Sequence, residues 1–277
     1  MPYRDALRPL ASSRTLLQVS ALALAMGLYA LIPTLQEYYL ADAVNISSQF
    51  HAVLSLVLGW LLVFRTNTAY QRWWEARTLW GALVNACRNM AIKFNQLGDV
   101  SGEELPRVCQ LITAFPVALK VHLRDENETK LPAEVRELAP GVEHVPQEIA
   151  RQLYAIAANA KQHHQIDGDE LRILDSELLR LMDICGGCER ILRTRIVKSY
   201  RVFARQCVLI FLITLPWGTA NDFGFWAIPM TIIAAYFMLG LEVVAEHVEE
   251  PFGYDEDDLD LDSLCETIGK TVREVFH

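Results

Sequence analysis

The sequence predicts an all-α membrane protein with four transmembrane helices and a helical cytoplasmic domain. Composition is the first observation that predicts this class. Hydrophobic residues make up 52% of the 277 residues and the mean hydropathy is +0.17, yet 21% of the residues are charged and the formal net charge is -9. Soluble domains rarely have so high a mean hydropathy, and a pure membrane bundle would carry fewer charges. The chain therefore combines segments suited to lipid with segments suited to water.

The second observation is an apolar run from Thr15 to Gln36 that contains no charged residue. At 1.5 Å per residue, a helix of this length crosses a hydrocarbon core of about 30 Å. A cleaved signal peptide is the alternative, because Arg4, Arg8 and Arg14 precede the run. The run is long for a signal peptide and lacks a small-residue cleavage site, so a first transmembrane helix is favoured.

Three further apolar runs predict the other spans. The second run covers residues 46–64, and the third and fourth cover 207–217 and 223–241 with a short loop containing Asn221 and Asp222 between them. Read together with the first run, they predict two helical hairpins. The expected parts of the chain are residues 1–64 with spans one and two, a cytoplasmic helical domain at 65–206, spans three and four at 207–245, and an acidic turn with a C-terminal cytoplasmic helix at 246–277.

The placement of basic residues gives these spans an orientation, because basic residues near span ends stay cytoplasmic. Basic residues lie near the span ends that are remote from the two connecting loops. They are Arg4, Arg8, Arg14, Arg65, Arg72, Arg77, Arg195, Lys198, Arg201 and Arg205. The two connecting loops carry Glu37, Asp42 and Asp222 and no Lys or Arg. We therefore expect a multi-pass protein of the cell membrane, which in bacteria is the inner membrane, with both termini in the cytoplasm. On this topology all six cysteines stay reduced, and the lone Cys185-Gly-Gly-Cys188 pair is read as structural rather than as a metal or redox site.

The section between Arg65 and Arg205 is expected to be helical almost throughout. Residues 171–184 repeat leucine or isoleucine every three or four positions, whereas no alternating strand pattern occurs. Residues 105–123 form another mostly apolar run, interrupted by Arg107, Pro116 and Lys120. We interpret it as a buried helix of the cytoplasmic domain; a further membrane span is the alternative and would break the topology.

Four apolar residues of the second span share one face of the predicted helix. Ala52, Leu56, Trp60 and Phe64 are spaced four apart and form a slowly drifting stripe. A stripe that faces lipid or packs against another helix is one interpretation. The other is a pore constriction, because each residue becomes an apolar ring in a symmetric oligomer, and such rings gate by dewetting.

Two sequence motifs resemble those of a known protein family. FRTNTAYQRWWEARTLWGALVN, Phe64 to Asn85, and EEPFGYDEDDLDLDSLC, Glu249 to Cys265, resemble the bacterial and plant-like branch of the bestrophin ion channels. The resemblance implies a homopentamer with one axial pore, whose second transmembrane helix lines a hydrophobic neck above a cytoplasmic vestibule. It assigns the neck to Leu56, Trp60 and Phe64, with Ala52 as a further candidate, although Trp60 is bulky for that position.

The resemblance also suggests two other sites. It places a second, cytoplasmic constriction near Asp169, where a ring of carboxylates would favour cations; a solvated aspartate at a helix start is the alternative. In animal members, acids after the last span and nearby carbonyls form a calcium clasp. Carried over, Asp255 and Asp258 would supply carboxylates here. Tyr254 departs from that pattern, and a solvated acidic turn that caps a helix is the favoured alternative. We therefore expect no required cofactor, with calcium as the possible one.

The expected function is a pentameric channel for monovalent ions, with anions such as chloride favoured by the family. The charge of -9 around a vestibule would favour cations, whereas Arg65 at the inner mouth of the neck would favour anions if it faced the axis. A cation-selective channel, a secondary transporter and a non-conducting scaffold are the alternatives. No catalytic or nucleotide-binding motif occurs, so we do not expect an enzyme. The adjacent His163 and His164 would point about 100° apart on a helix, so we do not expect a metal site at this pair. The expected partners are lipid, permeating ions and further copies of the chain, with no nucleic acid.

Overall fold

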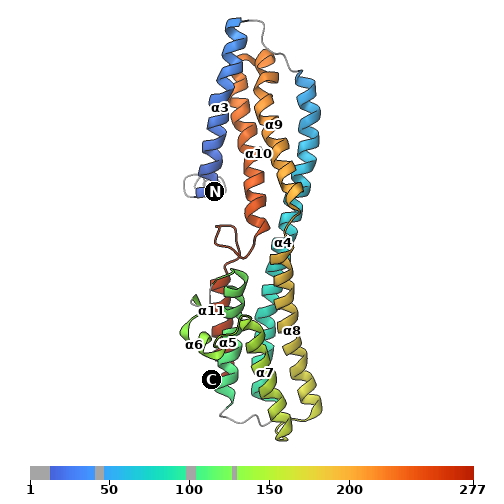
Figure 1. Ribbon diagram of the computed structural model, residues 1–277, viewed down its shortest axis with the longest axis vertical. Coiled ribbons are helices and arrows are strands. Elements are labelled where there is room, and N and C mark those ends of the chain that lie inside the picture. Colours follow the sequence, from blue (N-terminus) through green and yellow to red (C-terminus); the bar gives the residue numbers. More distant parts are fainter. Residues whose placement is uncertain (1–12, 41–46, 98–103, 127–129) are drawn as a thin grey trace, which may run out of the picture. The chain divides into compact units, whose positions relative to one another are not determined.

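A computed structural model describes residues 13–40, 47–97, 104–126 and 130–277, and these residues form helices and connecting turns with no strand among them (Figure 1). The expectation of an all-α protein is confirmed. The helices are α3 (Arg14–Leu40), α4 (Ser48–Gln96), α5 (Leu105–Leu123), α6 (Ala133–Leu138), α7 (Val145–Gln162), α8 (Gly168–Arg193), α9 (Lys198–Phe223), the 3-10 helix η2 (Gly224–Trp226), α10 (Ala227–Glu249) and α11 (Leu261–Phe276).

Three stretches of the described chain are long and apolar enough to cross a membrane: Thr15–Tyr39, Gln49–Gln96 and Lys198–Glu249. The third stretch contains both α9 and α10, which cover the third and fourth predicted apolar runs, and the count of four spans stays a prediction. The loop expected at Asn221 and Asp222 is different, because α9 continues through both residues to Phe223. The chain turns at Gly224, whose φ of 53° is readily adopted by glycine.

The described chain divides into two compact units. The first unit contains the residues up to Arg72 together with 195–249 and 255–257, and the second contains residues 73–194, 250–254 and 258–277. The expected domain limits at residues 64 and 206 differ from these limits. Residues 65–72 belong to the first unit because Arg65 pairs with Glu242 and because Nε of Arg72 donates to the carbonyl oxygen of Glu249 at 3.1 Å.

The first unit is built from α3, the beginning of α4, α9 and α10. Its α10 packs against both α3 and α9, and its core contains Ala23, Leu58, Leu62, Val208, Phe211, Leu212 and Ala235. Small residues let the helices approach closely. A Cβ atom at Gly27 on α3 would lie 2.4 Å from Cγ1 of Ile232 on α10, so only glycine fits there.

The second unit surrounds α5 with helices. This helix packs against α7, α11, α8 and α6, and ten of its residues are buried. The buried-helix interpretation of residues 105–123 is therefore confirmed, with the same bounds. The repeat on α8 also buries Leu174, Leu178, Leu181 and Ile184, which makes α8 an amphipathic helix with one face in the core.

Candidate functional site

The exposed surface of α4 in the first unit is the candidate site, and the helix is continuous over 49 residues from Ser48 to Gln96. Ala52, Leu56, Trp60 and Phe64 are all exposed, with exposed fractions of 65% for Leu56, 62% for Trp60 and 57% for Phe64. The rings of Trp60 and Phe64 contact each other with centroids 5.9 Å apart. The four residues of the predicted stripe therefore share a face that none of the other described residues covers.

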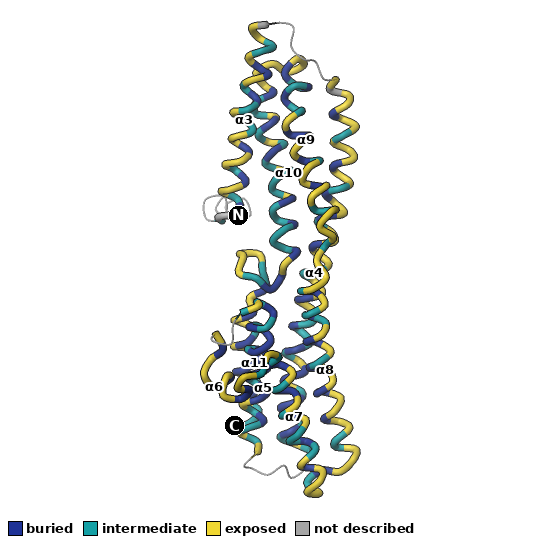
Figure 2. The backbone as a smooth tube through the Cα atoms, viewed as in Figure 1, coloured by how far each residue is buried: buried dark blue, intermediate teal, exposed yellow. Residues whose placement is uncertain are grey.

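The opposite face of α4 is the one that packs. Leu58 and Leu62 are each 4% exposed and lie in the core with α9 residues such as Phe211. Figure 2 shows many exposed positions on this part of α4 beside the buried ones. Val53, Val57 and Val63 are exposed as well, so apolar surface extends beyond the stripe.

A shallow apolar groove lies on the exposed side of α4. Ser55, Leu56, Gly59, Trp60 and Val63 line it. Gly59 has no atom near the position of a Cβ, so the groove is open there. Apolar surface of this extent needs a cover of lipid or of another protein surface.

Arg65 does not lie on this exposed face, so the condition under which it would act on anions, that it faces the axis, is not met in the single chain. Its side chain is fully buried, with Nε 2.7 Å from Oε2 of Glu242 and Nη1 3.8 Å from Oε2 of Glu249. One residue along an α-helix is a rotation of about 100°, and this rotation turns Arg65 away from Phe64 and into the interior of the unit. A guanidinium paired in this way is not available as an open anion filter.

Sequence reasoning missed both carboxylate partners of Arg65. Glu242 directly follows the last apolar run and Glu249 ends α10, seven residues later on the same side of the helix. Glu242 also accepts from Nε of Arg205 at 2.8 Å, and Oε1 of Glu249 accepts from the backbone N of Ile196 at 3.2 Å. The sequence signal for these partners was the pair of acids, Glu242 and Glu249, spaced seven residues apart at the end of the last apolar run.

Asp169 lies in the second unit, in the first turn of α8. Its side chain is 81% exposed and accepts from Nη2 of Arg172 at 2.6 Å. The N-cap is Asp167, whose Oδ1 accepts from the backbone N atoms of Asp169 and Glu170 at 2.8 Å each. Asp169 is therefore a solvated residue at a helix start, and its place at a constriction stays a prediction.

The acidic turn after α10 is held by a guanidinium. Arg124 donates from Nε to the carbonyl oxygen of Phe252 and from Nη2 to that of Gly253, each at 3.2 Å. Its guanidinium carbon also lies 4.0 Å from the ring centroid of Tyr254. Carbonyl oxygens of the kind that a calcium clasp uses are thus already engaged by a cationic side chain.

The two candidate calcium ligands fall in different units. Asp255 is exposed and belongs to the first unit, whereas Asp258 belongs to the second, where its Oδ2 would lie 2.7 Å from a Cβ added at Gly253. Within the described residues neither joins a group of three or more His, Cys, Asp or Glu ligand atoms. The calcium clasp that the resemblance suggests at Asp255 and Asp258 stays an untested suggestion.

The Cys185 and Cys188 pair is buried between helices. Both residues are 0% exposed and neither is in a disulfide. Burial raises the pKa of Cys185 to about 12, so the thiolate that a metal or redox reaction needs is scarce at neutral pH. The structural interpretation of this pair fits its surroundings.

Comparison with known proteins identifies the family of this chain. The sequence profile described as "Bacterial/Fungal Bestrophin protein" matches residues 7–274. A voltage-dependent anion channel-forming protein from Nostoc sp. is 33% identical over 80% of this chain and 75% of its own length. A protein of the same description from Synechocystis sp. is 32% identical over 84% of this chain and 78% of its own length.

The fold agrees with solved structures of the same family. A mutated form of a bacterial bestrophin homologue from Klebsiella pneumoniae superposes with a TM-score of 0.86 at 23% identity, covering 92% of this chain and 99% of that one. Another mutated form of that homologue gives a TM-score of 0.85 and covers 94% of this chain and 98% of that one. Because the profile spans almost the whole sequence and the folds coincide, this chain belongs to the bacterial and fungal bestrophin family of membrane proteins.

Proposed function

We propose that this chain forms a homopentameric channel that conducts monovalent anions such as chloride, with α4 around the pore axis. The exposed apolar stripe of Leu56, Trp60 and Phe64 is the observation that carries the proposal, because the described part of the protomer leaves it uncovered while the opposite face of α4 packs. A ring of identical chains covers much of this surface and brings one copy of each stripe residue to the axis.

The proposed neck consists of stacked apolar rings. Residues four apart on a helix are about 6 Å apart along its axis, so Ala52, Leu56, Trp60 and Phe64 form successive rings. Such rings gate by dewetting and select ions by the work of removing their water. Trp60 is the largest side chain of the stripe and lies against Phe64, so these two rings set the narrowest point.

The relatives support anions as the permeating ions. Proteins from Nostoc sp. and Synechocystis sp. that are 33% and 32% identical to this chain are named voltage-dependent anion channel-forming proteins. Arg65 is not part of the proposed filter, because its charge is compensated inside the protomer by Glu242. Anion preference is therefore assigned to the apolar neck, where ions that hold their water weakly enter most readily.

A reversal-potential measurement tests this function. The purified protein is reconstituted in a planar bilayer, and its current is recorded under a tenfold KCl gradient. Under this gradient the current of an ideally selective pore reverses at about 59 mV. We expect reversal near the chloride equilibrium potential. Reversal near the potassium value would replace the proposal with a cation channel, and silence at verified incorporation would replace it with a non-conducting scaffold.

The number of chains is tested separately. Native mass spectrometry of the detergent-solubilised protein should give five times the 31.4 kDa of one chain. A conducting monomer would place the pore within one chain instead of on a symmetry axis, and a conducting dimer would overturn the fivefold arrangement.

A cation-selective channel of the same fold is the second candidate. It is favoured by the net charge of -9 and by the exposed carboxylate of Asp169. Both act through long-range potential, which salt screens, whereas the neck acts at contact. Because the neck acts on the ion directly, we keep the anion channel as the proposal.

The proposed orientation places both termini in the cytoplasm of a bacterial inner membrane. It rests on the basic residues that flank the hairpins, which include Arg72, Arg195 and Lys198. A fluorescent protein fused after His277 should mature and fluoresce, and an alkaline phosphatase fused at the same position should stay inactive. The reverse pair of results would invert the topology.

A further inference from the structure

Three side chains from separate helices meet in the second unit. His122 lies near the end of α5, His144 is the N-cap of α7, and Glu189 lies in the last two turns of α8. Nε2 of His122 and Nε2 of His144 are each 2.8 Å from the same Oε1 atom of Glu189. The two imidazole centroids are 4.5 Å apart.

The hydrogen bonds of His144 define its protonation. The backbone N–H of Gln147 donates to Nδ1 of His144 at 3.1 Å, so Nδ1 carries a lone pair and the proton of the neutral ring is on Nε2. That Nε2–H donates to Glu189. The carboxylate therefore accepts N–H bonds from two rings on one oxygen, an arrangement in which a single cation could replace both protons.

We propose that His122, His144 and Glu189 form a binding site for a divalent transition-metal ion, zinc in particular. Within the part of the chain that the structure describes, their ligand atoms are the one set of three His, Cys, Asp or Glu atoms that lie within 4.8 Å of one another. Tetrahedral zinc holds imidazole nitrogen and carboxylate oxygen at about 2.0–2.2 Å, which requires ligand atoms a little over 3 Å apart. The two nitrogen–oxygen distances of 2.8 Å would have to lengthen slightly to reach that geometry, so the set needs only small side-chain movements.

The ligand types select zinc over calcium and magnesium. Two imidazoles and one carboxylate suit zinc and its neighbours in the first transition row, whereas calcium and magnesium prefer oxygen ligands. Three protein ligands leave a fourth position for water. The side chains are between 20% and 29% exposed, so an ion can enter from solvent without unfolding the unit.

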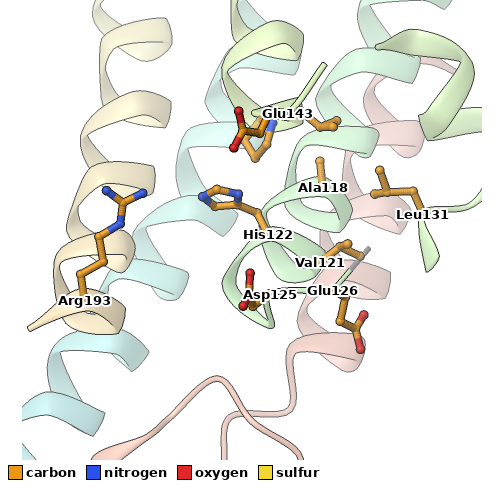
Figure 3. Close-up of a pocket in the computed structure, with 10 residues that line it drawn as sticks. Ala118, Val121, His122, Asp125, Glu126, Leu131, Glu143 and Arg193 are labelled. Atoms are coloured by element: carbon orange, nitrogen blue, oxygen red, sulfur yellow. The ribbon is translucent and has the colours of Figure 1, made fainter. Parts of the chain in front are cut away.

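The surroundings favour a cation. A pocket of about 360 Å³ borders His122, and its lining includes the carboxylates of Asp125, Glu126 and Glu143. Figure 3 shows His122 with Asp125 and Glu143 around this pocket and Arg193 of α8 on its edge. Acidic groups outnumber the basic one among these lining residues, and their potential raises the local concentration of cations.

Binding would change the hydrogen bond at the start of α7. Coordination through Nε2 requires the His144 proton to move to Nδ1, and the N–H of Gln147 then loses its acceptor. The ion would in return connect α5, α7 and α8 directly. The site would therefore act as a structural tie of the second unit, independent of whether the protein conducts ions.

Isothermal titration of zinc into the chelator-stripped, full-length protein tests the site. The protein is purified with a tag that contains no histidine. We expect one tight zinc site per chain, and at least about a 100-fold loss of affinity in His122→Gln and in Glu189→Gln, because changes in groups that only support a ligand already cost 10–100-fold. Unchanged affinity in both variants, or no binding by the unaltered chain, would overturn the proposal.

Two control variants separate this site from its rivals. His163→Gln combined with His164→Gln removes an exposed histidine pair, and Cys185→Ser combined with Cys188→Ser removes the neighbouring thiols; both should keep zinc affinity. X-ray absorption at the zinc edge of the unaltered chain does not depend on how any variant folds. It should show nitrogen and oxygen ligands with imidazole scattering, whereas sulfur ligands or water alone would overturn the proposal.

Discussion

The guanidinium of Arg65 and the carboxylate of Glu242 form an ion pair inside the first unit, with Nε and Oε2 2.7 Å apart and the arginine side chain fully buried. This pair joins α4 to α10 at the level where Arg205 of α9 reaches the other oxygen of Glu242. Three helices thus meet at one carboxylate. The pair orients α4 so that the Phe64 side of the helix faces outward.

Removing one partner of this pair should destabilise the protein. We expect Glu242→Gln to lower the stability of the fold by about 3–5 kcal/mol, because the charge of Arg65 is then left buried with weaker compensation. Thermal melting of the detergent-solubilised protein, followed by loss of the oligomer peak in size-exclusion chromatography, measures the effect. Glu246→Gln is the matched control, since Glu246 is half-exposed and pairs with Arg205 at the surface. Equal melting of both variants would contradict the role of the pair.

Shortening the Trp60 side chain should widen the proposed neck. We expect Trp60→Ala and Phe64→Ala each to raise single-channel conductance severalfold, because the two rings contact each other at the proposed narrowest point. Leu28→Ala is the control, since Leu28 is 68% exposed on α3 and is not part of the stripe. Conductance that stays unchanged in both neck variants would move the neck elsewhere on α4.

The helices were predictable because their signals are local. The apolar period of α8 and the bounds of α5 follow from residues within one segment, so 105–123 could be assigned to a buried helix from the charged residues and the proline that interrupt it. The stripe of Ala52, Leu56, Trp60 and Phe64 was predictable as a shared face for the same reason. Helical spacing defines which residues share a face, and it says nothing of what covers that face.

The direction of Arg65 depends on residues far along the chain. Its neighbour Phe64 is exposed, whereas Arg65 is buried, and its charge is compensated by Glu242, 177 positions later. The buried positions Leu58, Leu62, Arg65 and Ala69 do follow a three-to-four spacing, which was a local hint. The cluster of His122, His144 and Glu189 had no such hint, because three helices bring together residues that form no motif.

Neutralising Asp169 should change ion selectivity if five copies form the proposed cytoplasmic constriction. We expect Asp169→Asn to move the reversal potential further toward the chloride value, because a ring of negative charge that attracts cations is removed. The side chain is 81% exposed, so the change in free energy is at most about 1 kcal/mol and the permeability ratio changes at most about fivefold. Asp175→Asn on the same helix is the control, as Asp175 is also exposed. Identical reversal potentials for the unaltered protein, Asp169→Asn and Asp175→Asn would show that Asp169 does not line a constriction.

Calcium should have no effect on the acidic turn, because Arg124 already engages the carbonyl oxygens of Phe252 and Gly253. We expect Arg124→Gln to lower the melting temperature, since two charge-assisted hydrogen bonds and the contact with Tyr254 are lost together, at about 1.5–3 kcal/mol for each such bond. Arg151→Gln is the control, because Glu148, three residues away on the surface, is its one ion-pair partner among the described residues. Adding calcium back to chelator-treated protein should leave both the melting temperature and the current unchanged. A calcium-dependent rise in melting temperature that disappears in Asp255→Asn or Asp258→Asn would instead establish the clasp, and Arg124 would then have to give up its carbonyl partners to the ion.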